Sequence, residues 1–129
     1  MIALAPISDK NEINRLFSEN GLVYSEFSGC VKAKCGEELL GFCLYSLDEN
    51  KIVIYKIVPE DDLGLADGIL RSTLHVAAER SIMNAFYSGE DTEKLCCRLE
   101  FIKNREEKRL DIDKLFESCC SCRKTVKTF

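Results

Sequence analysis

Long apolar runs are missing from this sequence. None is long enough to span a bilayer, and the apolar start "MIALAPIS" has neither the basic beginning nor the length of a signal peptide. We therefore expect no membrane segment, and we expect these first residues to form a strand or to lead into the first helix. The 129 residues have room for one core, so we predict a single domain over residues 1–129.

Positive charge is also scarce. Lys and Arg number 18 against 22 Asp and Glu, which gives a formal net charge of -4. A chain of this charge has no general attraction to nucleic acid or to an anionic membrane. The basic end "RKTVKTF" is too short to reverse that balance. We expect neither nucleic acid nor membrane as a partner.

Histidine occurs once, as His75. A Cys-His or Ser-His relay therefore cannot form without that residue. Arg71, His75 and Glu79 follow one another at intervals of four, opposite the apolar stripe of a predicted helix. This spacing favours a solvated surface position for His75.

Cysteine, in contrast, is abundant, with eight residues. The chain has enough Leu, Ile, Val and Phe to build a core without disulfides, and adjacent cysteines make poor disulfide frameworks. We therefore expect a reduced, cytoplasmic protein. Cys119, Cys120 and Cys122 fall in a tail, residues 119–129, that has no clear period. Three thiols within four residues lack the two spaced pairs of a structural zinc site, so we predict no metal.

The pattern of apolar residues predicts a mixed α and β fold. Asp9 and Glu12 have capping-box spacing at the start of a helix over residues 9–20. Strands joined by tight turns follow, in "LVYSEF", "CVKAKC", "ELLGFCLYSL" and "IVIYKIV". After Pro59 come a long amphipathic helix, the short strand "MNAFY", a helix over "TEKLCCRLEF", a solvated turn or hairpin at "KNREEKR", and "RLDIDKLF" as a strand running into a helical turn.

This order predicts an α+β fold with a mostly antiparallel central sheet flanked by helices and one βαβ unit. Residues 38–80 resemble the core of the GNAT superfamily, the acyl-CoA-dependent N-acyltransferases. The resemblance rests on Gly41 in the third strand, on "IVIYKIV" closing with "VPE", and on "GLADGILRSTLHVAAER" as the helix of motif A. "CRLEF" resembles the end of the fourth helix, and the likeness spans residues 8–115.

The resemblance implies an acetyl-CoA site at the start of the helix that begins near Gly64. Backbone N–H groups at a helix start lack intrahelical partners and lie at the positive end of the helix dipole, so they hold a pyrophosphate well. The pantetheine arm lies along the central strand in this family. The cofactor-binding residues implied are Ile57, Val58, Gly64, Leu65, Ala66, Asp67 and Gly68.

Two departures from the family pattern concern charge and catalysis. Asp61 stands where the family has Arg or Gln, and the loop that begins at Pro59 is one residue short. Asp61 and Asp62 would repel a phosphate, or else they cap the helix. Cys96 stands where the family has its general-acid Tyr, and a helical cysteine is more often a small core residue.

No catalytic residue is assigned from the sequence. The nearest carboxylate to the central strand is Glu60 at its end, and Tyr87 is a second phenol on the strand after motif A. Either an amine acceptor is activated by such groups, or the site carries no chemistry.

Two functions therefore stay open. The first is an N-acyltransferase that moves an acetyl group from acetyl-CoA to a small-molecule or protein amine. The acidic surface favours a cationic acceptor, such as a polyamine, a lysine or an N-terminal amine. The second is a catalytically inactive GNAT-fold binding protein, in which open sheet edges or cysteine-bearing faces mediate partner binding or a homodimer.

Overall fold

The computed structural model describes residues 2–115. It contains three helices and seven strands within that range. In chain order they are β1 (Ile2–Pro6), α1 (Lys10–Glu19), β2 (Ser28–Cys35), β3 (Glu38–Leu47), β4 (Ile52–Val58), α2 (Leu63–Ala78), β5 (Ala85–Tyr87), α3 (Glu90–Arg98), β6 (Ile102–Asn104) and β7 (Arg109–Leu110).

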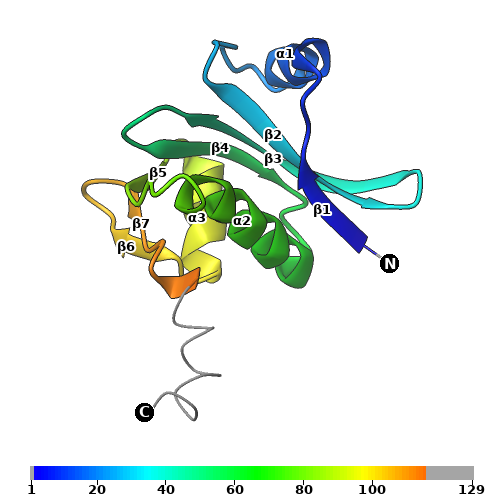
Figure 1. The fold of residues 1–129 in the computed structure, drawn as a ribbon. Coiled ribbons are helices and arrows are strands. Elements are labelled where there is room, and N and C mark those ends of the chain that lie inside the picture. The colour runs from blue at the N-terminus through cyan, green and yellow to red at the C-terminus, as the bar shows by residue number, and fades with distance from the viewer. Residues whose placement is uncertain (1, 116–129) are drawn as a thin grey trace, which may run out of the picture.

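The seven strands form one sheet in the order β1-β2-β3-β4-β5-β7-β6. All neighbouring strands are antiparallel except β4 and β5, which are parallel and joined through α2. Figure 1 shows α2 lying across one face of this sheet, with α1 at the far end of β2. The predicted α+β fold with one βαβ unit is confirmed.

The core has two parts, one on each face of the sheet. The larger part packs α2 and α3 against β2, β3, β4 and β5, and its fully buried members include Ile54, Ile69 and Leu74. The smaller part packs α1 on the opposite face, where Phe17 is fully buried and meets the rings of Tyr24 and Tyr55 edge-on. Burying aromatic rings in this way contributes much of the stability of a small cluster.

Local capping explains where α1 begins. The Asp9 carboxylate accepts hydrogen bonds from the backbone N–H groups of Asn11, at 3.0 Å, and Glu12, at 3.3 Å. The carboxyl group of Glu12 meets the Lys32 ammonium group on β2. The predicted helix is therefore confirmed, and its last turn ends before Gly21, whose φ is +70°.

Two predicted elements are wrong in part. "LVYSEF" is not a strand, because the serines close a turn: the Ser25 N–H donates to the Ser28 hydroxyl at 2.9 Å. The helix predicted over residues 92–101 spans residues 90–98, because Gly89 at φ +99° starts it and Glu100 at φ +60° lies beyond its end. "KNREEKR" is confirmed as a hairpin turn between β6 and β7.

None of the helices within residues 2–115 is long and apolar enough to cross a membrane.

Candidate functional site

A β-bulge interrupts the pairing of β4 with β3. Leu44 pairs with Lys56 and Tyr45 pairs with Ile54, so Tyr55 is an extra residue on β4. A bulge bends its strand and increases the local twist. The second half of β4 therefore changes direction at Tyr55.

Strands β4 and β5 part at the same level. Their parallel pairing ends with Ile54 opposite Tyr87, and the Ser88 N–H donates to the Ile54 carbonyl at 2.9 Å. One residue later the Thr92 hydroxyl of α3 donates to the Tyr55 carbonyl at 2.9 Å. Beyond this point, no described strand pairs with that side of β4. The sheet thus opens between β4 and α3.

Two of the predicted cofactor-binding residues lie on the parted half of β4. Ile57 is buried in the larger core, and Val58 is half-buried at the end of the strand. In the register with β3 they lie opposite Cys43 and Phe42. Backbone groups alternate between the two sides of a strand, and the Val58 carbonyl oxygen lies beside Gly41 of β3, so the groups that face the opening are those of Ile57.

Gly41 on β3 fixes the position of the end of β4. A Cβ atom at Gly41 would lie 2.2 Å from the Val58 carbonyl oxygen and 2.8 Å from Pro59 Cδ. It would also lie 2.9 Å from Ile69 Cδ1 on α2. Glycine is required here because the backbone of β4 and the side chain of α2 both occupy the space that a side chain would fill.

The start of α2 leaves two backbone donors open. The Asp62 carboxylate caps the helix by accepting from the Leu65 N–H at 3.1 Å, and the Ala66 N–H donates to the Asp62 carbonyl at 2.9 Å. Among the described residues, the N–H groups of Leu63 and Gly64 have no partner. Of the predicted phosphate-binding residues, Gly64 therefore keeps a free donor, while Leu65 and Ala66 use theirs within the helix.

The remaining predicted residues of α2 face other neighbours. The Asp67 carboxylate pairs with the Arg71 guanidinium at 2.8 Å, which offsets its charge. A Cβ atom at Gly68 would meet Leu4 of β1 at 3.8 Å. Gly64 and Gly68 both line a hollow of about 460 Å³ between α2 and β1, whose other lining residues are Ile2, Leu4, Leu40, Asp62 and Leu65. This hollow lies on the β1 side of α2.

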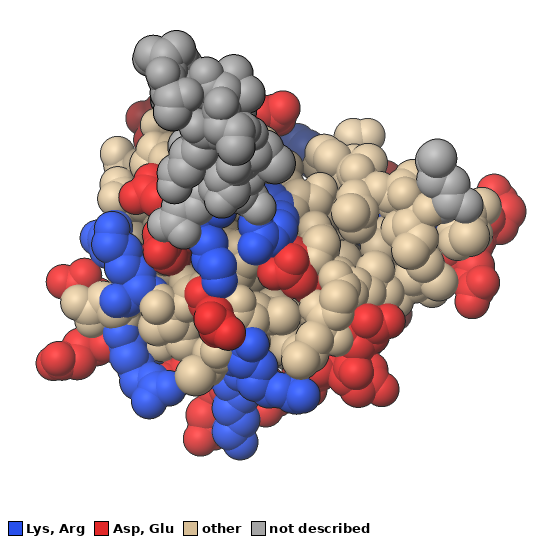
Figure 2. Space-filling model, turned by 90° about the horizontal axis from the view of Figure 1, so that it is seen from below, with Lys and Arg blue, Asp and Glu red and all other residues tan. Residues whose placement is uncertain are grey.

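Two cations that the sequence analysis did not single out lie across the opening. Lys94 and Arg98 of α3 line a hollow of about 140 Å³ together with Glu60, which stands in the segment leading into α2. Neither Lys94 nor Arg98 takes part in an ion pair with another described residue. Figure 2 shows one face of the molecule, on which Lys and Arg gather on one half, interspersed with Asp and Glu, and the other half is mainly uncharged.

Spacing alone could have found these cations. Asp91, Lys94, Leu95 and Arg98 recur at intervals of three and four, which places them on one face of a helix. What the sequence could not show is that this face turns toward Glu60, more than thirty residues away in the chain.

The Tyr87 hydroxyl is a buried polar group without a hydrogen bond among the described residues. The side chain is 2 % exposed, at the last paired position of β5. Burial, followed by the neighbouring charge of Glu93, raises the pKa of Tyr87 above its ordinary value. A buried hydroxyl without a hydrogen-bond partner destabilises the folded state by roughly 1–3 kcal/mol. A polar group entering between β4 and β5 would remove this cost by forming the hydrogen bond.

Cys96 is fully buried on α3, and burial raises the pKa of its thiol to about 12. Its interpretation as a small core residue is confirmed. Within residues 2–115, no group of three or more His, Cys, Asp or Glu side chains could hold a metal ion. Cys119, Cys120 and Cys122 lie outside the described residues.

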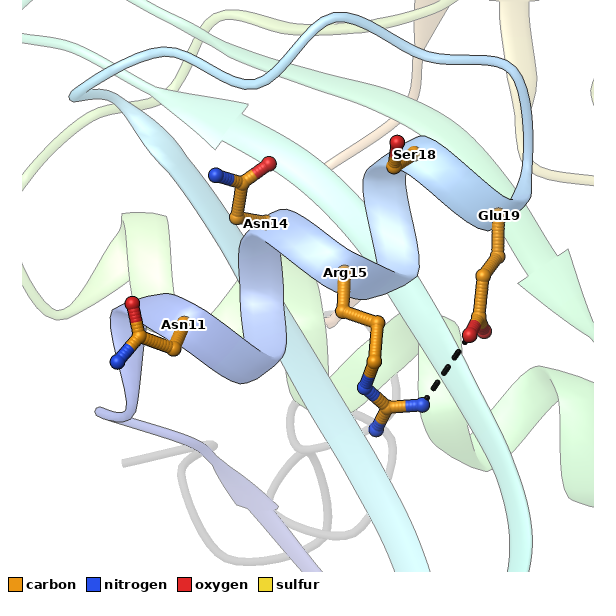
Figure 3. A pocket seen from close by; sticks show the side chains of 5 residues that line it. All are labelled: Asn11, Asn14, Arg15, Ser18 and Glu19. Carbon is orange, nitrogen blue, oxygen red and sulfur yellow. Dashed lines mark hydrogen bonds and ion pairs between the residues drawn. The ribbon is translucent and has the colours of Figure 1, made fainter.

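Two other surfaces carry no site. His75 is exposed on α2, as predicted. A shallow hollow on α1 is lined by Asn11, Asn14, Arg15, Ser18 and Glu19, and Figure 3 shows these polar side chains along one side of the helix. Arg15 pairs there with Glu19 at 3.2 Å. An exposed ion pair of this kind contributes little to stability, and the side chains around it form no binding site.

Asp62 is expected to stabilise α2 while weakening anion binding at its start. Asp62→Ala removes the cap and should lower the free energy of unfolding by about 1 kcal/mol, whereas Asp62→Asn keeps a capping oxygen and should stay within a few tenths. Removing the charge in Asp62→Asn should tighten the binding of inorganic pyrophosphate. Urea denaturation and titration calorimetry measure the two effects. Unchanged stability in Asp62→Ala would contradict the capping role.

No protein-family model matches this sequence, and no curated protein is significantly similar to it. Solved structures are similar in fold. A ribosomal-protein-alanine N-acetyltransferase from Brucella melitensis aligns with a TM-score of 0.57 at 16% identity, covering 77% of this chain and 90% of that one.

Two further structures of similar fold come from acetyltransferases of other kinds. A GNAT family acetyltransferase from Elizabethkingia anophelis with acetyl-CoA bound aligns with a TM-score of 0.56 at 14% identity, covering 78% of this chain and 74% of that one. An aminoglycoside acetyltransferase from an uncultured soil metagenomic sample aligns with a TM-score of 0.56 at 11% identity, covering 77% and 84%. At these identities the likeness establishes the fold.

Proposed function

Because this chain has the fold of the GNAT acetyltransferases, we propose that it is an acyl-CoA-dependent N-acyltransferase that transfers an acetyl group to an amine. The observation that carries the proposal is the parting of β4 and β5 at the Tyr55 bulge, on a strand that leads into the start of α2 with its open backbone donors. Fold alone does not establish an activity, so the proposed activity depends on the residues at this opening.

The residues at the opening fit coenzyme A. The free N–H groups of Leu63 and Gly64 suit the pyrophosphate, because the positive end of the helix dipole adds to their attraction. Lys94 and Arg98 supply the positive charge that Asp61 lacks at the family position. The 140 Å³ hollow that they line is smaller than the roughly 300–1,000 Å³ of ligand pockets, so it suits one phosphate group, with the rest of the cofactor lying along β4.

Bound acetyl-CoA would supply an acyl group activated as a thioester. Of the two residues implied on β4, Ile57 would offer its backbone groups to the pantetheine arm on the open side, because those of Val58 point toward β3. Glu60 lines the hollow proposed for the phosphate, a pantetheine length away from the thioester, so we assign no residue of this chain as the base that accepts the amine proton. The buried Tyr87 hydroxyl marks where a polar atom of the cofactor would complete a hydrogen bond.

A GNAT-fold binding protein without catalysis is the second candidate. The observation that favours it is the Asp62 carboxylate, which occupies the Leu65 N–H and places a negative charge beside the donors that a phosphate would use. Asp61 and Glu60 add to that charge. On this reading the open donors of Leu63 and Gly64 bind only water.

Titration calorimetry of the reduced chain with acetyl-CoA tests the proposal. We expect a micromolar dissociation constant, weakened by about a hundredfold or more in Gly64→Asp, because an added carboxylate repels the pyrophosphate. An acidic residue in the first turn of a helix leaves the fold intact. Gly64→Ala is the matched control: a Cβ atom there meets only Asp62 Oδ1 at 3.7 Å, so binding should be kept.

The cations of α3 enter the same experiment. Arg98→Ala should weaken binding by about tenfold, whereas Arg15→Ala, on the outer face of α1, removes an equal charge and should leave binding unchanged. No binding at millimolar acetyl-CoA would overturn the enzyme proposal and leave the binding protein. Binding followed by an amine-acceptor screen would separate the acceptor classes.

A further inference from the structure

The two edges of the sheet are protected to different degrees. The described sheet ends in β6 on one side, a strand of three residues that carries Lys103, and in β1 on the other. β1 has five residues, "IALAP", with no charge, and all five are exposed. Natural sheets normally block a free edge with charges, bulges or short strands, because an open edge pairs with other chains. β1 lacks these devices except for Pro6 at its end.

The free edge of β1 offers backbone groups in a defined pattern. The Ile7 N–H donates to the Cys30 carbonyl on β2 at 2.9 Å, and the register continues without a shift. Because backbone groups alternate along an antiparallel strand, Ala3 and Ala5 also point toward β2. The groups that point outward therefore belong to Ile2, Leu4 and Pro6.

We propose that β1 is the interface of a homodimer, in which β1 of one copy pairs antiparallel with β1 of a second copy about a two-fold axis at Leu4. The proposal is independent of the acyltransferase activity. The axis sets Leu4 opposite Leu4 of the second copy and Ile2 opposite Pro6. About four main-chain hydrogen bonds form, two between the Leu4 residues and two from Ile2 N–H to the Pro6 carbonyl. Pro6 has no N–H, but this pairing uses only its acceptor.

The side chains agree with this pairing. Leu4 lies opposite Ala33 and Pro6 opposite Val31, both of which are buried on the α2 face of the sheet. Ile2 is 50% exposed and Leu4 37%, so their apolar surface is still open in a single copy. In Figure 2 the half of the molecule that holds β1 shows a mainly uncharged surface with acidic side chains at its border. Pairing would bring this surface against its own copy.

The antiparallel helix dipoles favour a second copy as the occupant. Two hollows meet at Leu4: the one toward Ile2 has Asp62 as its single charged lining residue, and the one toward Pro6 has His75, Glu79 and Arg80. The two-fold axis places the hollow toward Ile2 of one copy against the hollow toward Pro6 of the second copy. Asp62 at the start of α2 in one copy then faces both Glu79 and Arg80 just after α2 in the second, and the positive end of each helix dipole lies toward the negative end of the other.

Sedimentation velocity of the reduced full chain, from low micromolar to sub-millimolar concentration, tests the proposal. We expect a dimer, and Leu4→Lys should raise its dissociation constant by about tenfold or more, because two ammonium groups then meet at the axis. Met83→Lys is the matched control, since Met83 is a similar 40% exposed on another part of the surface and its exchange should leave the dimer intact.

A second variant guards against misfolding, because Leu4 also contacts α2. Ala5 is exposed and points to the opposite face of the sheet, so Ala5→Lys leaves that contact in place. The same axis pairs residue 5 with residue 3 of the second copy, so Ala5→Lys should also weaken the dimer. Circular dichroism confirms the fold of each variant. A wild-type chain that stays monomeric, or a dimer unchanged in both β1 variants, would overturn the proposal.

Discussion

Gly41→Ala is expected to lower the free energy of unfolding by about 3 kcal/mol, at the upper end of what one extra methyl group does in a packed site. The methyl group would lie 2.2 Å from the Val58 carbonyl oxygen, and backbone cannot rotate aside as a side chain can. Either β3 moves away from β4 or the end of β4 moves into the opening. The midpoint of urea denaturation measures the loss.

The matched control for Gly41→Ala is again Gly64→Ala. Outside its chain neighbours and the nearby helix backbone, a Cβ at Gly64 would meet only Asp62 Oδ1, at 3.7 Å, and alanine is favoured over glycine in a helix. Its midpoint should stay the same or rise slightly. Equal midpoints for the two variants would show that β3 is not held against Val58. If Gly41→Ala folds but loses acetyl-CoA affinity, the displaced strand is β4.

Alkaline pH is expected to destabilise the chain steeply. Burial raises the pKa of Cys30 and of Cys96 to about 12, from an ordinary value of 9.0, and raises that of Cys43 further. Below pH 9 these thiols are protonated in both folded and unfolded chains, so their contribution is fully present. Above pH 9 the unfolded chain loses protons that the folded chain keeps, and the contribution declines up to about pH 12.

Each such thiol removes about 1.4 kcal/mol per pH unit in this window, so three together remove about 4 kcal/mol per unit. Tyr45, whose pKa burial raises to about 12, adds to the decline above pH 10. Lys32 opposes it, because burial lowers the pKa of its ammonium group. Urea midpoints at pH 8, 9 and 10 under reducing conditions measure the slope.

An adjacent pair of cysteines supplies the control. Cys96→Ala should reduce the slope by about one third, whatever the cavity does to stability at neutral pH. Cys97→Ala is the matched exchange at an exposed neighbouring position, and it removes none of the three buried thiols. If the urea midpoint of the wild type did not change between pH 8 and 10, the thiols of Cys30, Cys43 and Cys96 would be accessible to solvent in the folded chain.

Local patterns predicted most of the fold. The Asp9 cap, the alternation of Val31 and Ala33 with lysines, and the β-branched run of β4 each depend on near neighbours in the chain, and each element lies where the sequence indicated. "LVYSEF" misled because Leu22 and Tyr24 are apolar for another reason. They pack on the α1 cluster from a loop, and no strand is available to pair with them.

The site was harder to predict, because it depends on contacts between distant segments. Sequence alone placed the helix start near Gly64 and the central strand at Ile57 and Val58. It could not show that Asp62 takes the Leu65 donor rather than Asp61, or that Gly68 turns toward β1. That the charged face of α3 turns toward the opening also depends on tertiary packing, which the sequence of α3 does not show.

The bulge at Tyr55 shifts the alternation of side chains along β4 by one residue. In an uninterrupted strand, Ile54 and Ile57 would point to opposite faces, because they are three residues apart. The extra residue puts both into the larger core, while Tyr55 packs in the smaller one. The seven residues of β4 thus have two environments. The first half pairs with a strand on each side, and the second half borders the opening toward α3 while Ile57 stays buried.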